Sequence, residues 1–411
     1  MKKLLVKNIG LLATPEGKSA HRGEEQGKIK FLKDAWVLIE DGIIASVGTG
    51  AVPAVEGAEV VDAEGHLVTP GLVDAHTHLI FGGWRQNELG LKLHGASYLD
   101  IQNAGGGIQS TTNATRQASE QELAAKASKA LDEMMGFGTT TVEAKSGYGL
   151  ATEHELKALE VIKDLNDHHR MDLVATFMGA HLVPAEYKSN REEYVRLVCE
   201  EMMPKVKEQG IAKFCDVFCE ADTFTVEESR QVLEAGLKYG LRPKIHADEI
   251  EAIGGSQLAG EIGAISAEHL IVCPPEGIRS LARGGTVACC LPATSFYLGA
   301  DYAPVRDMVN AGVPVAVATD FNPGSCPGSS LQLAMNIACL KYRMTPEEVL
   351  TAVTLNAAAA IGRAGTIGSV EPGKQADLLL WNAPDLDYVC YRFGSNLVGT
   401  VMKKGQIVHE E

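Results

Sequence analysis

Two histidines spaced i, i+2 follow an apolar run near residue 70. The run from Leu67 to Val73 has the composition of a buried β-strand, and His76 and His78 stand just beyond it. Residues two apart on an extended chain project to the same side, so both imidazoles can reach one ion. Such pairs serve enzymes that use a metal to hydrolyse a bond. Alone, the spacing is a weak signal, because paired histidines also occur in cores and on surfaces.

Further candidate ligands stand at the ends of other apolar runs. His246 follows a run that begins at residue 243, His269 ends the segment 264–269, and Asp320 closes the segment 313–320. Three histidines and one carboxylate suit zinc or ferrous iron and leave a position for water. Polar residues at the C-terminal ends of several apolar strands are hard to explain as core packing. The sequence therefore predicts a metal site.

Between residues 71 and 365 the pattern alternates between strands and helices. Helix starts are indicated by capping boxes at Ser119, Thr152, Thr225 and Thr345, each followed three residues later by a glutamate. Eight strands are expected, at 72–78, 139–145, 173–181, 214–220, 244–248, 264–269, 286–291 and 313–320. Eight strand–helix units predict an α/β fold, a TIM-type (β/α)8 barrel whose active site lies at the strand C-termini.

The two ends of the chain have the pattern of short β-strands. Residues 36–45 indicate a hairpin that turns at Asp41-Gly42, and a second hairpin is expected around Lys404-Gly405. Terminal segments of a domain often lie close together. We therefore expect a small β-sandwich domain built from residues 1–70 and 366–411, flanking a barrel of residues 71–365.

Composition excludes several classes of protein. The chain has 411 residues, 45% of them hydrophobic, and a formal net charge of −16. This charge disfavours binding to nucleic acid or to an anionic membrane. We find neither a long apolar run nor a leader peptide, so we expect a cytoplasmic protein with no membrane span. Nine cysteines without a C-x-x-C pair indicate reduced, buried thiols.

Several longer motifs are far more specific than the histidine pair. They are Phe81–Arg85, Lys145–Leu150, Phe177–His181, His246–Glu249 and Ala318–Ser325. With them, and with a barrel that begins V-x-P-G-L-V-D-x-H-x-H, nearly the whole chain resembles the amidohydrolase superfamily and, within it, the imidazolonepropionase family. The resemblance implies hydrolysis of the ring C–N bond of 4-imidazolone-5-propanoate to N-formimino-L-glutamate in histidine degradation. It also implies a small anionic heterocyclic substrate and a homodimer.

The resemblance assigns roles to individual residues. The implied metal ligands are His76, His78, His246 and Asp320. The implied substrate contacts are Arg85, Tyr148, His181, Glu249, Asn322, Gly324 and Ser325. We expect one divalent or trivalent ion per subunit, zinc or iron, because the fourth strand ends at Glu220 without the lysine that bridges two ions in binuclear members. Lys145 belongs to the second strand.

Proton transfer is expected from Glu249, His269 or Asp320, which the sequence does not rank. His269 has three interpretations: a ligand of a second ion, a group that orients the attacking water, or a partner of Asp320 or the backbone. Arg85 is expected to clamp the propanoate carboxylate with its planar fork. Two residues depart from the family pattern, Trp84 and Cys326, and both could reshape the rim of the pocket.

Two other functions remain open at this stage. An amidohydrolase or deaminase acting on a different cyclic amide or heterocycle would use the same ligands, so a panel of substrates distinguishes it. A non-catalytic scaffold on this fold would be expected to have lost metal ligands, which this chain retains.

Overall fold

The computed structural model describes residues 2–95 and 106–410, and the statements below concern those residues. The barrel strands are β6 (Leu72–Asp74), β7 (Thr139–Lys145), β8 (Asp172–Ala180), β9 (Phe214–Cys219), β10 (Arg242–Ala247), β11 (Ser266–His269), β12 (Val287–Cys290) and β13 (Val315–Val317). The strands of the second sheet are β1 (Lys3–Thr14), β2 (Lys30–Glu40), β3 (Ile43–Thr49), β4 (Glu59–Asp62), β5 (Leu67–Pro70), β14 (Leu378–Trp381), β15 (Val398–Lys403) and β16 (Gln406–Glu410).

The α-helices are α1 (Leu89–Leu93), α3 (Gly107–Gln117), α4 (Glu120–Gly136), α5 (Thr152–His168), α6 (Arg191–Leu197), α7 (Met203–Gln209), α8 (Val226–Lys238), α9 (Gly255–Glu261), α10 (Pro275–Gly284), α11 (Pro292–Leu298), α12 (Val305–Asn310), α13 (Leu331–Ile337), α14 (Pro346–Ala352), α15 (Leu355–Ala360) and α16 (Leu386–Tyr391). Shorter helical turns are η1 (Gly23–Gly27), η2 (Gln86–Glu88), η3 (Ala185–Tyr187), η4 (Val198–Met202) and η5 (Ala338–Tyr342). Within the described ranges, no helix has the length and apolarity to cross a bilayer.

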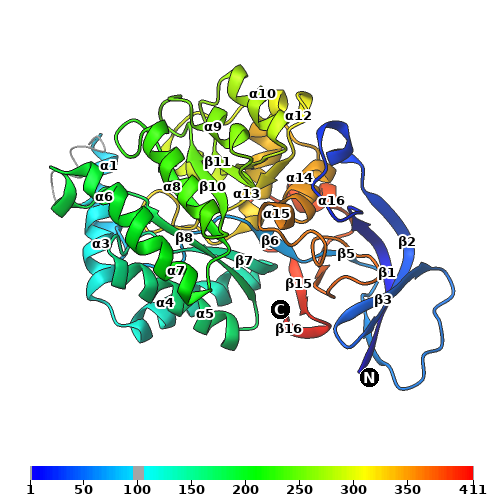
Figure 1. Ribbon diagram of the computed structural model, residues 1–411. Coiled ribbons are helices and arrows are strands. Elements are labelled where there is room, and N and C mark those ends of the chain that lie inside the picture. Colours follow the sequence, from blue (N-terminus) through cyan, green and yellow to red (C-terminus); the bar gives the residue numbers. More distant parts are fainter. Residues whose placement is uncertain (1, 96–105, 411) are drawn as a thin grey trace.

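Strands β6 to β13 pair in chain order, each parallel to the next, and helices cover the outside of the sheet (Figure 1). Every barrel strand is buried except for Arg242, the first residue of β10. The predicted TIM-type barrel is therefore confirmed. Three predicted capping boxes form, at Ser119, Thr225 and Thr345. The fourth prediction is wrong: Ala151 precedes α5, and Glu155 binds backbone amides of the preceding loop instead.

The barrel closes just beyond the ends of its first and last strands. The amide of Asp320 donates to the carbonyl of His76 at 3.1 Å, and the amide of His78 donates to the carbonyl of Phe321 at 2.8 Å. Below them, the side chain of Thr319 donates to the buried carboxyl of Asp74 at 2.5 Å. The strand ends that carry the candidate ligands thus also seal the barrel.

The expected single strand from Leu67 to Val73 is wrong. The run is divided between two sheets: β5 pairs with β1 and β14, whereas β6 pairs with β7. The break falls at Pro70-Gly71. Proline lacks the amide hydrogen that a continuous ladder needs, and a Cβ on Gly71 would lie 2.5 Å from the side chain of Thr140. His76 and His78 follow β6 and do not lie within it.

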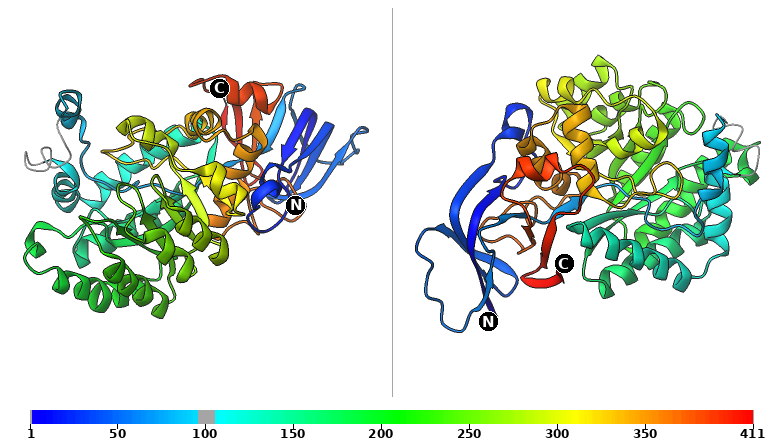
Figure 2. Two further views of the ribbon diagram at one scale, coloured as in Figure 1. Left: turned by 90° about the horizontal axis from the view of Figure 1, so that it is seen from above. Right: turned by 180° about the vertical axis from the view of Figure 1, so that it is seen from behind.

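The second sheet joins the two ends of the chain, with strand order β16-β15-β14-β5-β1-β2-β3 and β4 on β1. The blue N-terminal and red C-terminal strands therefore belong to one unit beside the barrel (Figures 1 and 2). Both predicted hairpins, β2–β3 and β15–β16, are confirmed. The exact division at residues 70/71 and 365/366 stays a prediction.

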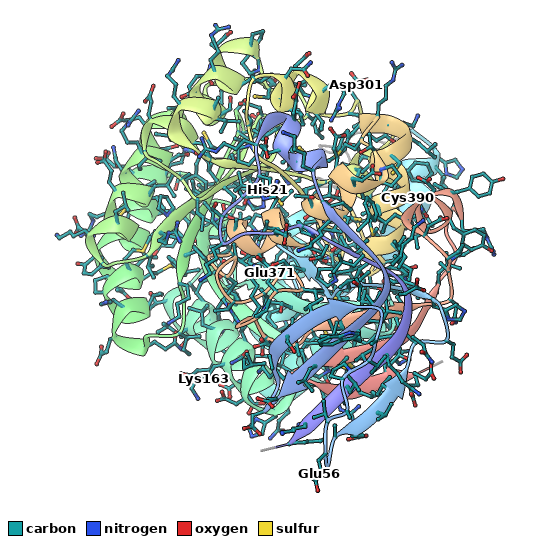
Figure 3. All side chains as sticks on the ribbon, turned by 90° about the vertical axis from the view of Figure 1, so that its right-hand side faces the viewer. His21, Glu56, Lys163, Asp301, Glu371 and Cys390 are labelled. Carbon is teal, nitrogen blue, oxygen red and sulfur yellow. The ribbon has the colours of Figure 1, made fainter. Side chains whose placement is uncertain are left out.

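The segment between β1 and β2 also binds the barrel. Gln26 is buried, and its side chain exchanges two hydrogen bonds with the backbone of Val315 in β13. His21 donates its amide to Asn356 of α15 at 2.7 Å, and Gly17 donates to Glu371 at 2.8 Å. Figure 3 views the molecule from this side, with His21 and Glu371 labelled. The N-terminal sheet is thereby fastened to the last barrel strand.

An ion cluster fastens the second sheet to the start of β8. Asp172 accepts from Lys403 at 3.0 Å, from Lys404 at 2.6 Å and from Gln375 at 3.0 Å. Arg363 approaches the same carboxylate at 3.4 Å. Burial alone would raise the pKa of Asp172, but these cations and hydrogen bonds outweigh it and hold the pKa well below its usual 3.8.

We predict that Asp172→Asn destabilises the protein by about 2 kcal/mol at pH 7, because the buried ammonium of Lys403 then keeps only Asp377 as a counter-charge. Since the folded pKa lies below the unfolded one, the contribution of the carboxylate is complete above about pH 5. It is lost as the pH falls towards the folded value. Urea unfolding at several pH values measures the difference. Asp167→Asn, which removes only an exposed pair with Lys163, should change stability by less than about 0.5 kcal/mol. Equal losses in the two variants contradict the prediction.

Candidate active site

The four candidate metal ligands converge at the C-terminal end of the barrel. The Nε2 atoms of His76 and His78 lie 3.4 and 3.6 Å from Oδ1 of Asp320. The Nε2 atoms of His78 and His246 lie 3.2 Å apart. All four side chains are buried. The structure therefore brings together the residues that the sequence predicted as ligands.

The donor atoms at this point fit a metal ion. Both ring nitrogens of His76, Nδ1 of His78 and Oδ1 of Asp320 are buried and have no hydrogen-bond partner among the described residues. Buried polar atoms are rarely left unpaired, and the unpartnered Nε2 of His76 and Oδ1 of Asp320 face each other at 3.4 Å, which calls for a ligand between them. Burial holds the pKa of His76 and His78 well below 6.5, so both rings are neutral and can offer a lone pair.

His246 is oriented from behind by a buried carboxylate. Its Nδ1 donates to Asp216 at 3.0 Å, which leaves the lone pair of Nε2 directed at His78. Metal-bound histidines commonly have such a carboxylate partner. Asp216 in turn accepts from Lys145 at 2.7 Å, and Lys145 also binds Glu143 at 2.7 Å. Lys145 is thus a structural cation beneath the site and is engaged by two carboxylates.

Several strand ends at the site have a left-handed backbone. Asp248, His269 and Asp320 have φ angles of 51°, 68° and 57°. This conformation is unfavourable for residues other than glycine and persists where the surroundings enforce it, often at functional sites. The second carboxylate oxygen of Asp320 accepts from Thr294 of α11 at 2.7 Å, which holds the side chain in place.

Glu249 and His269 face each other beside the ligands. Oε2 of Glu249 lies 3.7 Å from Nε2 of His269. One nitrogen of His269 also lies within 4.8 Å of ligand atoms of His76 and Asp320. Burial, together with the charges of Asp320 and Glu220, raises the pKa of Glu249 to about 8. The pair can therefore hold a proton close to the ligands.

Two glutamates to which the sequence analysis gave no role in the site hold its loops. Glu220, at the end of β9, accepts the amides of Ile250 and Glu251 at 2.9 and 3.0 Å, which positions the loop of Glu249. Glu155 accepts the amides of Gly147, Gly149 and Leu150 at distances between 2.8 and 3.2 Å. That loop carries Tyr148.

The rings of Tyr148 and His181 lie against the ring of the candidate ligand His78. The rings of His181 and His78 are stacked with centroids 4.9 Å apart, and the ring of Tyr148 lies 5.1 Å from that of His181. Nδ1 of His181 faces the carbonyl of Gly147 at 2.9 Å. Burial lowers the pKa of His181 to about 3, so the ring is neutral. A proton on Nδ1 then leaves Nε2 as an acceptor.

Arg85 lies against the loop that follows β13. A Cβ on Gly324 would overlap the guanidinium of Arg85, so only glycine allows this contact. The Arg85 side chain is 9% exposed, and the carboxylate of Glu88 lies 4.0 Å from its Nε. That nitrogen has no hydrogen-bond partner among the described residues, and Glu88 accepts the amide of Gly107 at 2.6 Å. Arg85 therefore keeps hydrogen-bonding capacity for an anion.

Asn322 shapes the loop against which Arg85 lies. The amide side chain of Asn322 is occupied within the loop, because its oxygen accepts the amides of Gly324 and Ser325 at 2.8 and 2.7 Å. Its nitrogen donates to the carbonyl of Asp320 at 2.7 Å. The loop is thus tied directly to a candidate ligand.

The two departures from the family pattern have different surroundings. Trp84 is 42% exposed and packs edge-on against Phe81 and Phe321, with ring centroids 4.8 and 5.8 Å away. Cys326 is buried in the loop, and burial raises the pKa of its thiol to about 12. Trp84 thus forms part of an aromatic cluster beside Asp320. Cys326 only fills space within the loop, and its thiol stays protonated at neutral pH.

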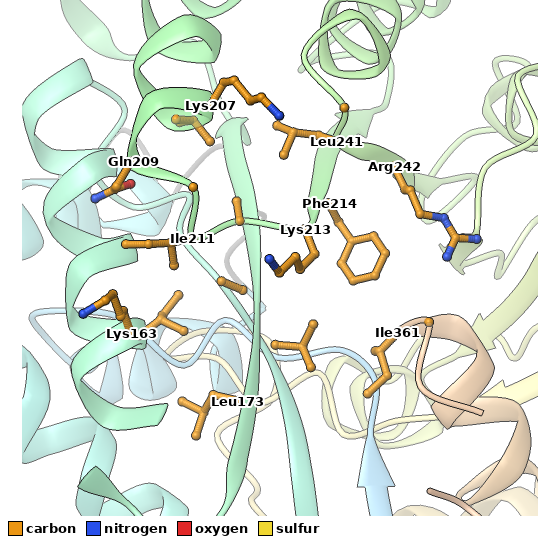
Figure 4. A pocket seen from close by; sticks show the side chains of 18 of the residues that line it. Lys163, Leu173, Lys207, Gln209, Ile211, Lys213, Phe214, Leu241, Arg242 and Ile361 are labelled. Carbon is orange, nitrogen blue, oxygen red and sulfur yellow. The ribbon is translucent and has the colours of Figure 1, made fainter. Parts of the chain in front are cut away.

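A cavity of about 760 Å³ lies elsewhere, at the N-terminal end of the barrel strands. Its lining includes Lys213, Phe214 and Arg242, near the starts of β9 and β10 (Figure 4). No candidate ligand or substrate contact lines it. We place the chemistry at the other end, where the unpaired donors converge.

Sequence reasoning missed the supporting residues Asp216, Thr294, Glu220 and Glu155. Asp216 had a detectable signal, because a carboxylate inside the apolar run 214–219 needs a buried partner. Thr294 and Glu220 had no such signal, because a threonine that follows a strand and a glutamate that ends one are both common on protein surfaces.

We predict that Asp216→Asn lowers the affinity for zinc by about 10- to 100-fold, because His246 loses the acceptor that orients it and raises its basicity. Competition with a chromogenic chelator measures this affinity. Asp377→Asn is the matched control, because that buried carboxylate binds Lys403 and Gln375 and no candidate ligand. Unchanged affinity in Asp216→Asn removes the positioning role.

The pH dependence of zinc binding should follow Asp320. Burial raises its pKa to about 6, whereas the pKa values of His76 and His78 lie well below 6.5. Because the ligand must be ionised, affinity should be constant above about pH 6 and fall roughly tenfold per pH unit below it. Thr294→Val removes a hydrogen bond that lowers this pKa, so the break should move to higher pH. A break that does not move in this variant assigns the titration to another group.

Comparisons with known proteins agree with this geometry. The amidohydrolase family profile matches residues 67–408. The imidazolonepropionase of Alkaliphilus metalliredigens is 50% identical over 414 residues, covering 99% of this chain and 98% of that protein. That of Brevibacillus brevis is 50% identical over 418 residues, covering 100% and 99%.

Solved structures with this fold are more distant in sequence. Escherichia coli guanine deaminase aligns with a TM-score of 0.76 at 16% identity, covering both chains fully. Atrazine chlorohydrolase of Arthrobacter aurescens, complexed with zinc, aligns with a TM-score of 0.68 at 19% identity, covering 99% of this chain and 95% of that one. At these identities they show the shared fold alone. The chain belongs to the amidohydrolase family and, within it, to the imidazolonepropionase family.

Proposed function

We propose that this protein hydrolyses 4-imidazolone-5-propanoate to N-formimino-L-glutamate, breaking the ring C–N bond at the carbonyl. Relatives about 50% identical over almost the full chain support this substrate. The structural observation that carries the proposal is Arg85, a nearly buried guanidinium beside a cluster of metal-ligand atoms, with an Nε that no described residue hydrogen-bonds. Glu88 reaches this cation only at 4.0 Å and also binds the amide of Gly107, so Arg85 can bind a second carboxylate.

The substrate carboxylate pairs with Arg85 in this proposal. A planar guanidinium binds a carboxylate through two parallel hydrogen bonds, which also sets the direction of the attached chain. Gly324 and Ser325 lie in the same loop, and their contacts to the carboxylate remain predictions, as does a substrate contact of Asn322. Tyr148, at the other side of His78, is proposed to contact the ring.

His181 is proposed to accept a hydrogen bond from a ring N–H through Nε2. Its neutral state and its contact with Gly147 support this direction. In the alternative, Nε2 of His181 would donate a hydrogen bond to the ring carbonyl. That would need a protonated imidazole, because Nδ1 already carries the proton that the carbonyl of Gly147 accepts.

We propose one zinc or iron ion held by His76, His78, His246 and Asp320. When bound, the ion polarises the ring carbonyl and lowers the pKa of water. Glu249 takes a proton from the attacking water and delivers it to the departing ring nitrogen. A pKa of about 8 suits this exchange near neutral pH. Nε2 of His269 faces the carboxyl group of Glu249 at 3.7 Å, and burial holds the pKa of His269 well below 6.5, so the proton resides on Glu249.

The first test is turnover of imidazolonepropanoate by zinc- or iron-loaded protein. We expect loss of the ultraviolet absorbance of the imidazolone, with formiminoglutamate identified as the product by mass spectrometry. Protein that binds metal but leaves this substrate unchanged, while hydrolysing or deaminating another heterocycle, overturns the substrate assignment.

We predict that Arg85→Lys lowers kcat/KM by about 10- to 100-fold, because it keeps the charge but loses the fork that binds the carboxylate. The loss should appear mainly in KM. The matched measurement uses the propanamide analogue of the substrate, on which both proteins should be equally slow. An equal loss on acid and amide contradicts the clamp.

We predict that Glu249→Gln lowers kcat by at least about 100-fold with little change in KM, because the amide cannot accept the proton. Metal content measured in the same sample is the control, since Glu249 is not a proposed ligand. Full turnover at saturating substrate would transfer the role to His269 or Asp320.

The cytoplasmic location, expected from the sequence, and the homodimer, implied by the family resemblance, also remain proposals. Sedimentation of the purified protein measures the oligomeric state.

A further inference from the structure

The cavity at the N-terminal end of the barrel strands is lined by charges of one sign. Its volume is about 760 Å³, and no aspartate or glutamate of the described residues lines it. The charged residues of its lining are five cations from different segments: Lys163 of α5, Lys207 of α7, Lys213 before β9, Arg242 of β10 and Arg363 after α15. The whole chain has a net charge of −16, so the cavity is opposite in sign to the rest of the protein.

Most of these cations have no carboxylate partner. Lys163 pairs with Asp167 at 3.3 Å, and Arg363 approaches Asp172 at 3.4 Å. Like charges held close together repel one another, and an anion placed between them removes that repulsion. Within the part of the chain that the structure describes, three cations of the lining have no ion pair: Lys207, Lys213 and Arg242.

The fold places these three cations around one space. Lys213 and Arg242 begin neighbouring parallel strands, and the amide of Arg242 donates to the carbonyl of Lys213 at 3.1 Å. Nζ of Lys207 lies 3.5 Å from the position that a Cβ would take at Gly240. Nη1 of Arg242 lies 3.2 Å from the corresponding position at Gly362. Both glycines line the cavity, so the cations reach from one of its walls to the next.

The surface between the cations is apolar. Phe214 follows Lys213 and pairs with Arg242, and Figure 4 shows its ring between these two side chains. Leu241 and Ile361 are further buried lining residues. Pockets for small molecules commonly have volumes of about 300–1,000 Å³ and combine apolar walls with a few polar groups. The cavity therefore suits an organic molecule that carries negative charges.

We propose that this cavity binds a small organic dianion, with phosphate or carboxylate groups that pair with Lys207, Lys213 and Arg242 and an apolar part that packs on Phe214. Arg242 can hold two anionic oxygens in its planar fork, and each lysine contributes a point charge. A cleft lined by cations also raises the local concentration of anions. The candidate metal ligands lie at the opposite end of the strands, so this site is separate from the candidate active site.

The bound dianion would link segments that are distant in the sequence. Lys207 belongs to α7, Arg242 begins β10, and Gly362 follows α15. A ligand that binds the folded protein and not the unfolded chain stabilises the fold in proportion to its concentration. We therefore expect the temperature of unfolding to rise as the dianion is added.

The test titrates the full-length, metal-loaded protein with phenyl phosphate and, separately, with phenylsuccinate, followed by calorimetry. We expect one site per chain outside the candidate active site, which weakens as salt is added. Lys213→Gln and Arg242→Gln should each weaken it about tenfold. Lys129→Gln on α4 and Arg279→Gln on α10 remove exposed cations away from the cavity and should bind like the unchanged protein. The tighter of the two ligands shows whether phosphate or carboxylate is preferred.

The same titration in Arg85→Lys separates this site from the candidate active site, because the cavity should keep its affinity in that variant. Three results overturn the proposal: neither dianion binds, binding survives in the double variant Lys213→Gln/Arg242→Gln, or binding disappears in Arg85→Lys. Unfolding temperatures without ligand show that each variant is folded. Turnover of imidazolonepropanoate is not measured, so the outcome is independent of the proposed function.

Discussion

Closure of the barrel at His76, His78 and Asp320 is the interaction on which the rest of the site depends. An unpaired strand edge in the core would leave backbone groups without partners. Here β6 and β13 are each three residues long, and the sealing hydrogen bonds come from the residues just beyond them. The backbone positions of three candidate ligands are therefore set by the folding of the barrel itself.

Beneath the ligands, the barrel interior contains paired charges where many barrels contain aliphatic layers. Lys145 binds Glu143 and Asp216, and Lys244 binds Glu268 at 3.2 Å. Buried ion pairs give little net stability, because desolvation offsets their attraction. These ion pairs orient side chains instead. Lys145 fixes the carboxylate of Asp216, and Asp216 in turn fixes the tautomer of His246.

The loops that carry the proposed substrate contacts are held by the same kind of hydrogen bond, from backbone amides to a side-chain oxygen. Glu155 and Glu220 each direct a carboxylate at successive backbone amides, one beneath Tyr148 and the other beneath Glu249. In the loop of Gly324, the side-chain amide oxygen of Asn322 accepts backbone amides in the same way. A loop whose amides are bound in this way keeps its conformation without regular secondary structure, and it can present a side chain at a fixed distance from the candidate ligands.

The sequence by itself determined the barrel, the paired ends of the chain and the set of candidate ligands. These features follow from local patterns: apolar runs mark strands, and polar residues at their ends mark the active face. The tertiary structure alone decided the break at Gly71, the diversion of Glu155 from helix capping to the Tyr148 loop, and the partnerships of Asp216 and Thr294. Each depends on which atoms meet across the fold. Strand register and packing choose those partners, and no local pattern records them.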